Sequence, residues 1–203
     1  MNRTDIINSL ISKFGYNSYL EIGVKNPKKN FDLILVNNKD GVDPNWKASP
    51  ANGHKFEMTS DIFFDGLDKD NKYDLIFIDG LHHSEQIDKD IINSLGHLNQ
   101  NGTIVLHDCN PTTKIMQRRP RISGQWTGDG WESVFKLRCS RSDLNIFVID
   151  VDFGCGIIRR GKQEVYIIDN NIENYLNWEY FNRNRKKILN LISMGEYKEW
   201  LIN

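Results

Sequence analysis

Residues 73–108 read YDLIFIDGLHHSEQIDKDIINSLGHLNQNGTIVLHD, and this stretch decides the fold. Residues 75–78 form a continuous apolar run, which is typical of a strand buried on both faces. Ser84 follows as a candidate helix cap, and apolar residues then recur at helical spacing over 87–98. A second apolar run over 103–106 indicates another buried strand. The pattern therefore predicts a βαβ unit with parallel strands and a right-handed crossover.

Acidic and imidazole side chains follow both of these strands. Asp79, His82 and His83 come after the first strand, and His107 and Asp108 come directly after the second. Parallel strands end at the same edge of a sheet, and open α/β sheets bind ligands beyond the carboxyl ends of their strands. We therefore expect a functional site at this edge.

Several chemical roles are open to these side chains. Asp79 and Asp108 could share a divalent cation through carboxylate oxygens, and they could equally contact a cationic cofactor or an active-site base. Strand-end aspartates also commonly cap the helix that follows. His82 is the best candidate for a general base, because an imidazole ordinarily titrates near neutral pH. His83 and His107 are its rivals, and a purely structural histidine is the alternative.

The N-terminal half carries a second set of candidate residues. A predicted strand ends on Glu21 and Gly23, and the next strand ends at Asp43, twenty residues after that glycine. This is the spacing at which doubly wound folds place an acid against a ribose diol, and a glycine lets backbone approach a ligand. No G-x-G-x-x-G is present, which favours a ligand with a ribose but no pyrophosphate. The alternative is a strand-end turn with solvated acids.

The remaining chain completes an alternating α/β pattern. The predicted elements are a first helix capped by Thr4, strands over 19–23, 39–42 and 54–58, a helix over 62–70, a helix over 131–138, strands over 145–149 and 156–159, and a C-terminal helix from residue 170. The last two strands are too close in sequence for a parallel crossover, so we expect them to be antiparallel.

A long loop over residues 109–130 is rich in proline, arginine and glycine, and such a loop in a compact domain is usually functional or mobile. Its basic and aromatic side chains, with the first residue of the next helix, are Lys114, Arg118, Arg119, Arg121, Trp126 and Trp131. Arginine and tryptophan together suit an anionic or sugar-like substrate. A solvated basic loop is the alternative.

The composition excludes several classes of protein. A length of 203 residues predicts one domain over 1–203, with 39% hydrophobic and 26% charged residues. A net charge of −1 gives no bulk electrostatic attraction to nucleic acid or membrane. The three cysteines are widely spaced, which argues against a zinc knuckle or a disulfide framework and fits a reducing cytosol. We expect a cytoplasmic protein without nucleic-acid or membrane partners.

On these motifs the chain resembles the class I S-adenosylmethionine-dependent methyltransferases. The matching segments are YLEIGV (19–24), GVDP (41–44), TSDIFF (59–64), YDLIFIDGLHHSEQIDKDI (73–91) and GTIVLHDCNP (102–111). More narrowly, IDGLHHSEQ followed by LHDCNP is similar to a small group found beside glycosyltransferases in polysaccharide gene clusters. It is also similar to the metal-dependent sugar O-methyltransferases of macrolide pathways.

This resemblance implies a Rossmann-like fold: a seven-stranded, mostly parallel sheet with an antiparallel last strand and helices on both faces. It also implies the roles of individual residues. Glu21 and Gly23 would lie at the methionine part of S-adenosylmethionine, Asp43 at its ribose, and Ser60 and Asp61 beside its adenine. Asp79 and Asp108 would match metal ligands. Asp79 would also contact the cofactor and take part in catalysis, and His82 would be the base.

Two departures from the family pattern stand out. Lys25-Asn26-Pro27 replace the usual second and third glycines of the first motif, and His107-Asp108 stand where many metal-dependent relatives have two acids. The implied function is O-methylation of a sugar or another small hydroxylated molecule, free or within a glycan, with Mg²⁺ as an optional second cofactor. The alternatives are a nucleotide-dependent oxidoreductase and a non-catalytic module that keeps the fold. The apolar C-terminal helix is a candidate homodimer surface.

Overall fold

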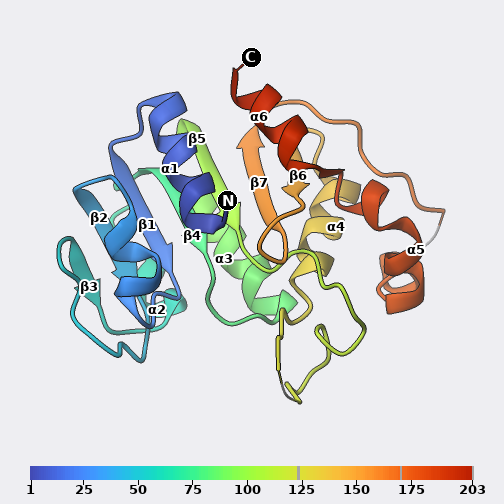
Figure 1. Ribbon diagram of the computed structural model, residues 1–203, viewed down its shortest axis with the longest axis horizontal. Helices are drawn as coiled ribbons and strands as arrows, with labels where there is room; N and C mark the ends of the chain where they lie inside the picture. The colour runs from blue at the N-terminus through green and yellow to red at the C-terminus, as the bar shows by residue number, and fades with distance from the viewer. Residues whose placement is uncertain (123, 170, 203) are drawn as a thin grey trace.

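One twisted sheet runs through the molecule, as seen in a computed structural model that describes residues 1–122, 124–169 and 171–202 (Figure 1). Its strands are β1 (Ser18–Ile22), β2 (Asn38–Val42), β3 (His54–Phe56), β4 (Tyr73–Ile78), β5 (Leu98–Leu106), β6 (Leu144–Ile149), β7 (Cys155–Arg160) and β8 (Leu191–Ile192). Their order in the sheet is β3-β2-β1-β4-β5-β7-β6-β8. The predicted Rossmann-like α/β architecture is confirmed.

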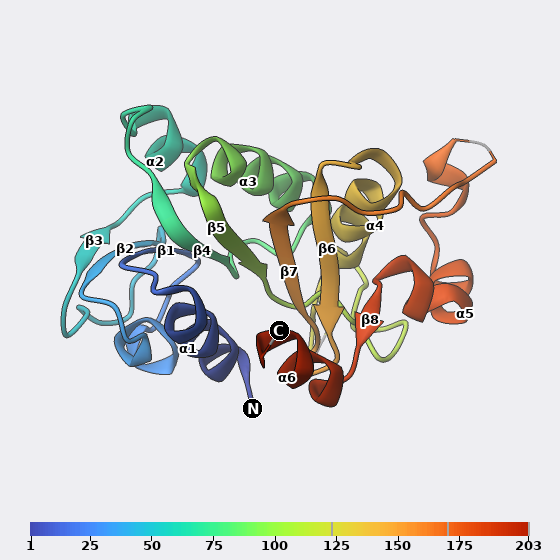
Figure 2. The ribbon, with the colours of Figure 1, turned by 90° about the horizontal axis from the view of Figure 1, so that it is seen from above.

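Helices cover both faces of the sheet, as expected. They are α1 (Arg3–Phe14), α2 (Ser60–Gly66), α3 (Ser84–Gly96), α4 (Gly130–Ser140), α5 (Trp178–Ile188) and α6 (Met194–Ile202), with short 3-10 turns at Pro27–Lys29, Phe31–Leu33 and Ile172–Asn174. Figure 2 shows α2, α3 and α4 on one face and α1 and α6 on the other. None of the helices in the described part of the chain has the length and apolar character needed to cross a membrane.

The predicted βαβ unit is confirmed, because β4 and β5 are parallel neighbours joined by α3. β7 is antiparallel to both β5 and β6, as the short connection before it required. The predicted count of seven strands was one short. β8 is only two residues long and pairs parallel to β6, so the last strand is not the antiparallel one.

Several predicted boundaries were wrong for local reasons. Asn2 caps α1 in a capping box, whereas Thr4 is buried and donates to the Asn30 side chain. Ser84 is the first residue of α3, and its N–H donates to the carboxylate of Asp129. Leu98 belongs to β5, where it pairs with Tyr73 across a register shift. The C-terminal helix, for which a break was also considered, is split into α5 and α6 by β8 and begins at Trp178; residue 170, its predicted start, lies outside the described residues.

Alternation along the central strand explains the two-sided core. Ile76 and Ile78 of β4 pack in the cluster that includes the buried faces of α2, α3 and α4. Leu75 and Phe77 belong to a second cluster, with residues of α1 and α6. All four side chains are almost fully buried, and burying one such side chain contributes about 1.5–3 kcal/mol. A strand packed on both faces needs this continuous apolar run.

Candidate active site

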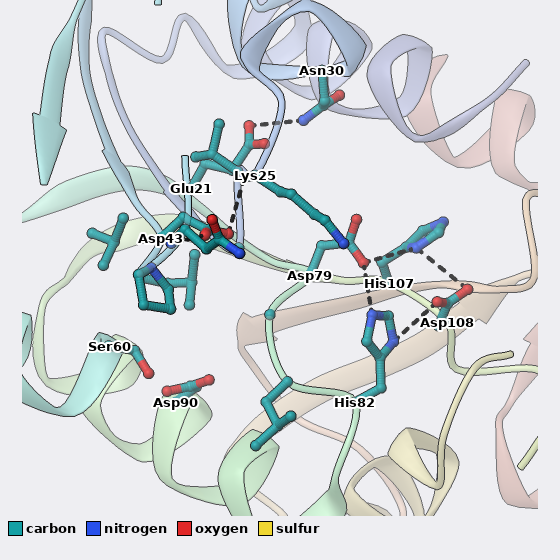
Figure 3. Close-up of a pocket in the computed structure, with 18 of the residues that line it drawn as sticks. Glu21, Lys25, Asn30, Asp43, Ser60, Asp79, His82, Asp90, His107 and Asp108 are labelled. Atoms are coloured by element: carbon teal, nitrogen blue, oxygen red, sulfur yellow. Dashed lines mark hydrogen bonds and ion pairs between the residues drawn. The ribbon is translucent and has the colours of Figure 1, made fainter. Parts of the chain in front are cut away.

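The carboxyl ends of the parallel strands border one large pocket of about 1080 Å³ (Figure 3). The residues to which the family resemblance gave a role all line it, namely Glu21, Gly23, Asp43, Ser60, Asp61, Asp79, His82 and Asp108. The parallel strands bring these positions together because each lies at or just beyond the carboxyl end of a strand, at the same edge of the sheet.

His82 and Asp108 form a hydrogen-bonded pair inside this pocket. The Nδ1 atom of His82 lies 3.0 Å from an Asp108 oxygen, and its Nε2 atom lies 3.8 Å from Asp79. Burial alone would lower the pKa of His82, but the hydrogen bond to Asp108 and the charges of both aspartates raise it above the usual value. If Nδ1 carries the proton that Asp108 accepts, Nε2 has a free lone pair in the neutral ring.

His107 lies between three carboxylates and is almost fully buried. Its Nδ1 is 3.2 Å from Asp79 and 3.4 Å from Asp108, and its Nε2 is 3.4 Å from Asp152. Burial lowers the pKa of His107, but the three carboxylates outweigh it and raise that pKa well above the usual value. The positive charge of Arg3, which lies 3.2 Å from Nε2, opposes protonation of His107. Asp152 contacts both the guanidinium and the imidazole and offsets this effect. We therefore treat His107 as a cation, which cannot accept a proton.

His83 is a weaker rival for the role of base. It occupies the N-cap position of α3, where its side chain makes no capping hydrogen bond. The His83 ring lies 6.2 Å from that of Trp126, and His83 is not among the described residues that line the pocket. The geometry therefore favours His82 as the base.

Arg3 and Asp152 are among the charged residues of the pocket that were not predicted from the sequence. Arg3 reaches it from the start of α1, where its guanidinium lies 3.9 Å from Asp79 and 3.2 Å from Asp152. Asp152 belongs to the turn between β6 and β7, with a left-handed backbone of φ 50°. The rule that acids follow strand ends could have found Asp152, whereas no sequence signal pointed to Arg3.

Glu21 interacts mainly with other parts of the protein. It is 2% exposed and accepts hydrogen bonds from Tyr19 at 2.6 Å and Asn30 at 2.9 Å. Burial raises the pKa of Glu21 to about 7 despite these two bonds. A side chain at Gly23, whose φ is 94°, would overlap the Asp79 carbonyl. This glycine therefore allows close packing of two strand ends, rather than only the predicted approach of a ligand.

At the position of the second glycine of the first motif, the backbone is left-handed although the residue is not glycine. Lys25 stands there with a φ of 51°, in the left-handed region that glycine adopts without cost. Its N–H donates to Asp43 at 2.9 Å, and its side chain extends into the pocket (Figure 3). The other oxygen of Asp43 accepts the Asn45 N–H at 2.7 Å. Asp43 is thus fixed by backbone donors, while its oxygens retain lone pairs for a ligand.

Several polar side chains from the start of α2 and from α3 meet beside the pocket. Asp61 accepts a hydrogen bond from Gln86 at 2.8 Å and lies 3.4 Å from Lys89, so it faces the outer rim of the pocket. Gln86 also lies 3.3 Å from Ser60 and 3.1 Å from Asp90. Asp90, which was not among the predicted site residues, also lines the pocket.

Comparison with known proteins gives the same architecture. Residues 20–109 match a family model described as "Methyltransferase domain". The O-methyltransferase TomG from Streptomyces achromogenes, solved with S-adenosylmethionine, has a TM-score of 0.58 at 13% identity, over 78% of this chain and 79% of that one. A Podospora anserina methyltransferase bound to S-adenosylhomocysteine gives 0.59 at 14% identity, over 79% and 78%.

This chain has the fold of the class I methyltransferases. MycE, a methyltransferase of mycinamycin biosynthesis solved with Mg, S-adenosylhomocysteine and mycinamycin VI, gives a TM-score of 0.50 at 15% identity, over 76% of this chain and 48% of that one. A search among curated proteins finds no significant sequence match. The family match and the methyltransferase fold support the S-adenosylmethionine-dependent enzyme that the sequence predicted.

The basic and aromatic loop of this methyltransferase fold is only partly directed at the pocket. Arg121 and Trp126 line it; the Trp126 ring lies 5.3 Å from that of His82, and the Arg121 guanidinium lies 5.8 Å from the Trp126 ring. Arg119 instead pairs with Glu85 at 2.6 Å and with Asp129 at 2.8 Å.

The other members of that predicted set lie elsewhere. Lys114 pairs with Glu179 at 2.6 Å, and the Arg118 carbonyl accepts the indole N–H of Trp126. Trp131 belongs to α4 and is fully buried in the core against Phe181, with ring centroids 4.3 Å apart. Trp131 was predicted as part of the helix as well as a possible sugar contact, and its burial in the core excludes the second role.

The donor set of this pocket fits a divalent cation. One ligand atom from each of Asp79, His82 and Asp108 lies within 4.8 Å of the others. Carboxylate oxygens suit Mg²⁺, and an imidazole nitrogen suits several transition metals. Arg3 and His107 bring positive charge close to both carboxylates, which weakens their attraction for an ion.

Proposed function

We propose that this protein transfers a methyl group from S-adenosylmethionine to a hydroxyl of a sugar or another small hydroxylated molecule. The observation that carries the proposal is one pocket that holds both Asp43 and the His82–Asp108 pair. Asp43 suits a ribose diol, and the paired imidazole suits a reacting hydroxyl. The groups suited to binding the adenosyl part and to accepting the proton therefore lie in the same pocket.

The residues present fit the cofactor. Asp43 is fixed at the end of β2 with oxygen lone pairs available to two hydroxyl donors. Lys25 extends an ammonium group into the same pocket, where it suits the carboxylate of the methionine part. When bound, S-adenosylmethionine supplies an electrophilic methyl group on a positively charged sulfur. The pocket volume of about 1080 Å³ leaves room for an acceptor as well.

The chain's own residues account for the proton. His82 accepts the hydroxyl proton of the acceptor on Nε2, while Asp108 holds Nδ1–H and stabilises the imidazolium that forms. Alignment of the hydroxyl with the methyl group supplies most of the rate. Mg²⁺ held by Asp79 and Asp108 would lower the pKa of the hydroxyl. Because His82 can act alone, we expect EDTA to lower the rate without abolishing it.

The acceptor class rests on the loop that faces His82. Trp126 and Arg121 offer a ring and a guanidinium at the pocket, a combination that suits a sugar carrying an anionic group. MycE, which was solved with mycinamycin VI, shares the fold, and the resemblance of the sequence motifs to macrolide sugar O-methyltransferases favours the same acceptor class. The predicted link to polysaccharide gene clusters and the predicted homodimer belong to this proposal as well.

The two rival functions make different predictions. An oxidoreductase on a doubly wound fold would bind NAD and have a fully parallel sheet, but β7 is antiparallel to both of its neighbours. A non-catalytic module would bind neither ligand. Calorimetry with S-adenosylhomocysteine and with NADH separates the three functions. We expect micromolar binding of the former and none of the latter; the absence of S-adenosylhomocysteine binding would overturn the proposal.

A further inference from the structure

Asp90 is a buried acid that lines the pocket and has no role in the mechanism above. It lies on α3 and is 1% exposed, with Ile87 and Ile91 of the same helix in the core. Its carboxylate has two neighbouring donors, Gln86 at 3.1 Å and the Ser60 hydroxyl. Burial raises the pKa of Asp90 above its usual value. A buried carboxylate is costly, so its presence at a cavity wall calls for a reason.

Fastening α2 to α3 does not explain this acid. Gln86 already joins the two helices through Asp61 at 2.8 Å. Lys89 adds a second link to Asp61 at 3.4 Å. A neutral or apolar residue at position 90 would serve the contact between helices without the cost of a buried charge. The position of Asp90 on the pocket wall is therefore more informative than its hydrogen bonds.

The pocket places Asp90 at one particular part of an adenosyl ligand. Figure 3 shows Ser60 and Asp90 on one side of the pocket, and His82 and Asp108 on the other. The reacting methyl group must lie near His82. With the ribose held by Asp43, the base then extends away from His82, toward Ser60 and Asp90. This step rests on the proposed function.

We propose that Asp90 is the residue that selects adenine over other purines. Its carboxylate accepts a hydrogen bond from the exocyclic amino group of adenine. Hypoxanthine has a carbonyl oxygen at that position, and two acceptors facing each other in a buried site repel. Ser60 and Gln86 hold the carboxylate in place from the protein side. Asp90 is thus a specificity residue for the cofactor, distant from the methyl transfer itself.

The test compares two ligands that differ at position 6 of the base, where adenine has an amino group and hypoxanthine has a carbonyl together with a proton on the neighbouring N1. Calorimetry at pH 8 measures the Kd of the wild-type protein for S-adenosylhomocysteine and for S-inosylhomocysteine. We expect the adenine ligand to bind at least about tenfold tighter, since hydrogen bonds to charged groups are among the stronger ones.

The variant Asp90→Asn then tests the residue. An amide can accept from the adenine amino group and can also donate to the hypoxanthine carbonyl. We expect its affinity for S-adenosylhomocysteine to stay within about threefold of wild type, while the preference between the ligands falls to about threefold or less. The matched control is Asp65→Asn, an exposed acid of α2 outside the large pocket, which should keep the wild-type preference.

Each outcome has a distinct meaning. A wild-type protein that binds both ligands equally overturns the role of Asp90 without the need for any variant, so a poorly folded variant cannot hide the answer. An Asp90→Asn protein that keeps the full preference overturns it too, and would leave Asp90 a structural residue. A wild-type protein that binds neither ligand overturns the proposed function, and the role of Asp90 with it.

Discussion

At the scale of single residues, the pocket separates two histidines by the number of carboxylates around each. His82 is bonded to Asp108 and lies at longer range from Asp79, so it can lose its proton. His107 is enclosed by three carboxylates and keeps its proton. The sequence could predict that both would lie near the strand ends. It favoured His82 as the base but gave no reason to set His107 aside, because that reason depends on Asp152, which lies in a turn far along the chain from both histidines.

Replacing His82 with alanine tests the assignment of the base. We expect the cofactor contacts made by other residues to survive, so that the Kd for S-adenosylhomocysteine changes by less than about threefold. Methyl transfer should fall by at least about 100-fold, since a general base contributes about 10²–10⁴. Calorimetry and single-turnover kinetics measure the two effects. His83→Ala is the control, for which we expect an unchanged Kd and an unchanged rate of methyl transfer. Unchanged turnover in His82→Ala would exclude His82 as the base.

Lys25 allows a test in which stability and binding change in opposite directions. A left-handed backbone costs a non-glycine residue about 1–2 kcal/mol, partly offset by the greater entropy of glycine in the unfolded chain. Lys25→Gly should therefore raise the free energy of unfolding by about 0.5–1 kcal/mol. Loss of the ammonium group should weaken S-adenosylhomocysteine binding about fivefold. Urea unfolding and calorimetry measure both, with the exposed Lys28→Ala as control.

At the scale of elements, the periodicity of apolar residues predicted whether a segment is a helix or a strand, but not its first and last residues. The apolar run of β4 and the stripe of α3 predicted the central βαβ unit. Ser84 had the chemistry of a helix cap, yet Asp129 from a distant loop supplies the acceptor at that helix end. β8 could not be predicted, because two residues carry no alternation and the strand exists only by pairing with β6.

The first turn of α4 carries an acid whose ionisation opposes folding. Burial, followed by repulsion from Asp129, raises the pKa of Glu132 to about 7. Between pH of about 4.5 and 7 the unfolded chain has released this proton while the folded chain retains it. The free energy of unfolding should therefore fall as the pH rises through this range, by on the order of 1–2 kcal/mol.

Glu132→Gln should remove this part of the pH dependence. The variant should be more stable than wild type at pH 8 and similar to it at pH 4.5, because glutamine resembles the protonated acid. Urea unfolding across the pH range measures the difference between the two proteins. A wild-type and a variant curve that run parallel from pH 4.5 to 8 would contradict the assignment.

At the scale of the whole molecule, the two ends of the chain pack together on one face of the sheet (Figure 2). The buried Tyr197 of α6 makes a hydrogen bond of 2.8 Å with Ser9 of α1, and Trp200 packs against Phe14 and Phe147. The apolar positions of α6 thus serve the protein's own core. The sequence predicted that strand-end residues would lie together, because parallel topology requires it. It did not predict Arg3, whose position depends on how the N-terminal helix packs on the sheet.

Tyr197→Ala should therefore destabilise the whole protein. Removing a fully buried aromatic side chain costs about 3–5 kcal/mol, which urea unfolding measures as a loss of unfolding free energy. Tyr197→Phe, which removes only the hydroxyl, should cost about 1 kcal/mol. Both variants should bind S-adenosylhomocysteine within about threefold of wild type while folded. A small effect of the alanine variant would show that α6 is dispensable for the fold.

The loop that faces the acceptor is anchored where it meets the base. Gly128 has a φ of 63°, and a side chain there would overlap the carbonyl of His82, while the Asp129 N–H donates to that same carbonyl. The joint fixes the end of the loop, yet Arg121 and Trp126 lie before it. Exchanging side chains ahead of the joint would thus reshape this wall of the pocket and leave the position of His82 undisturbed.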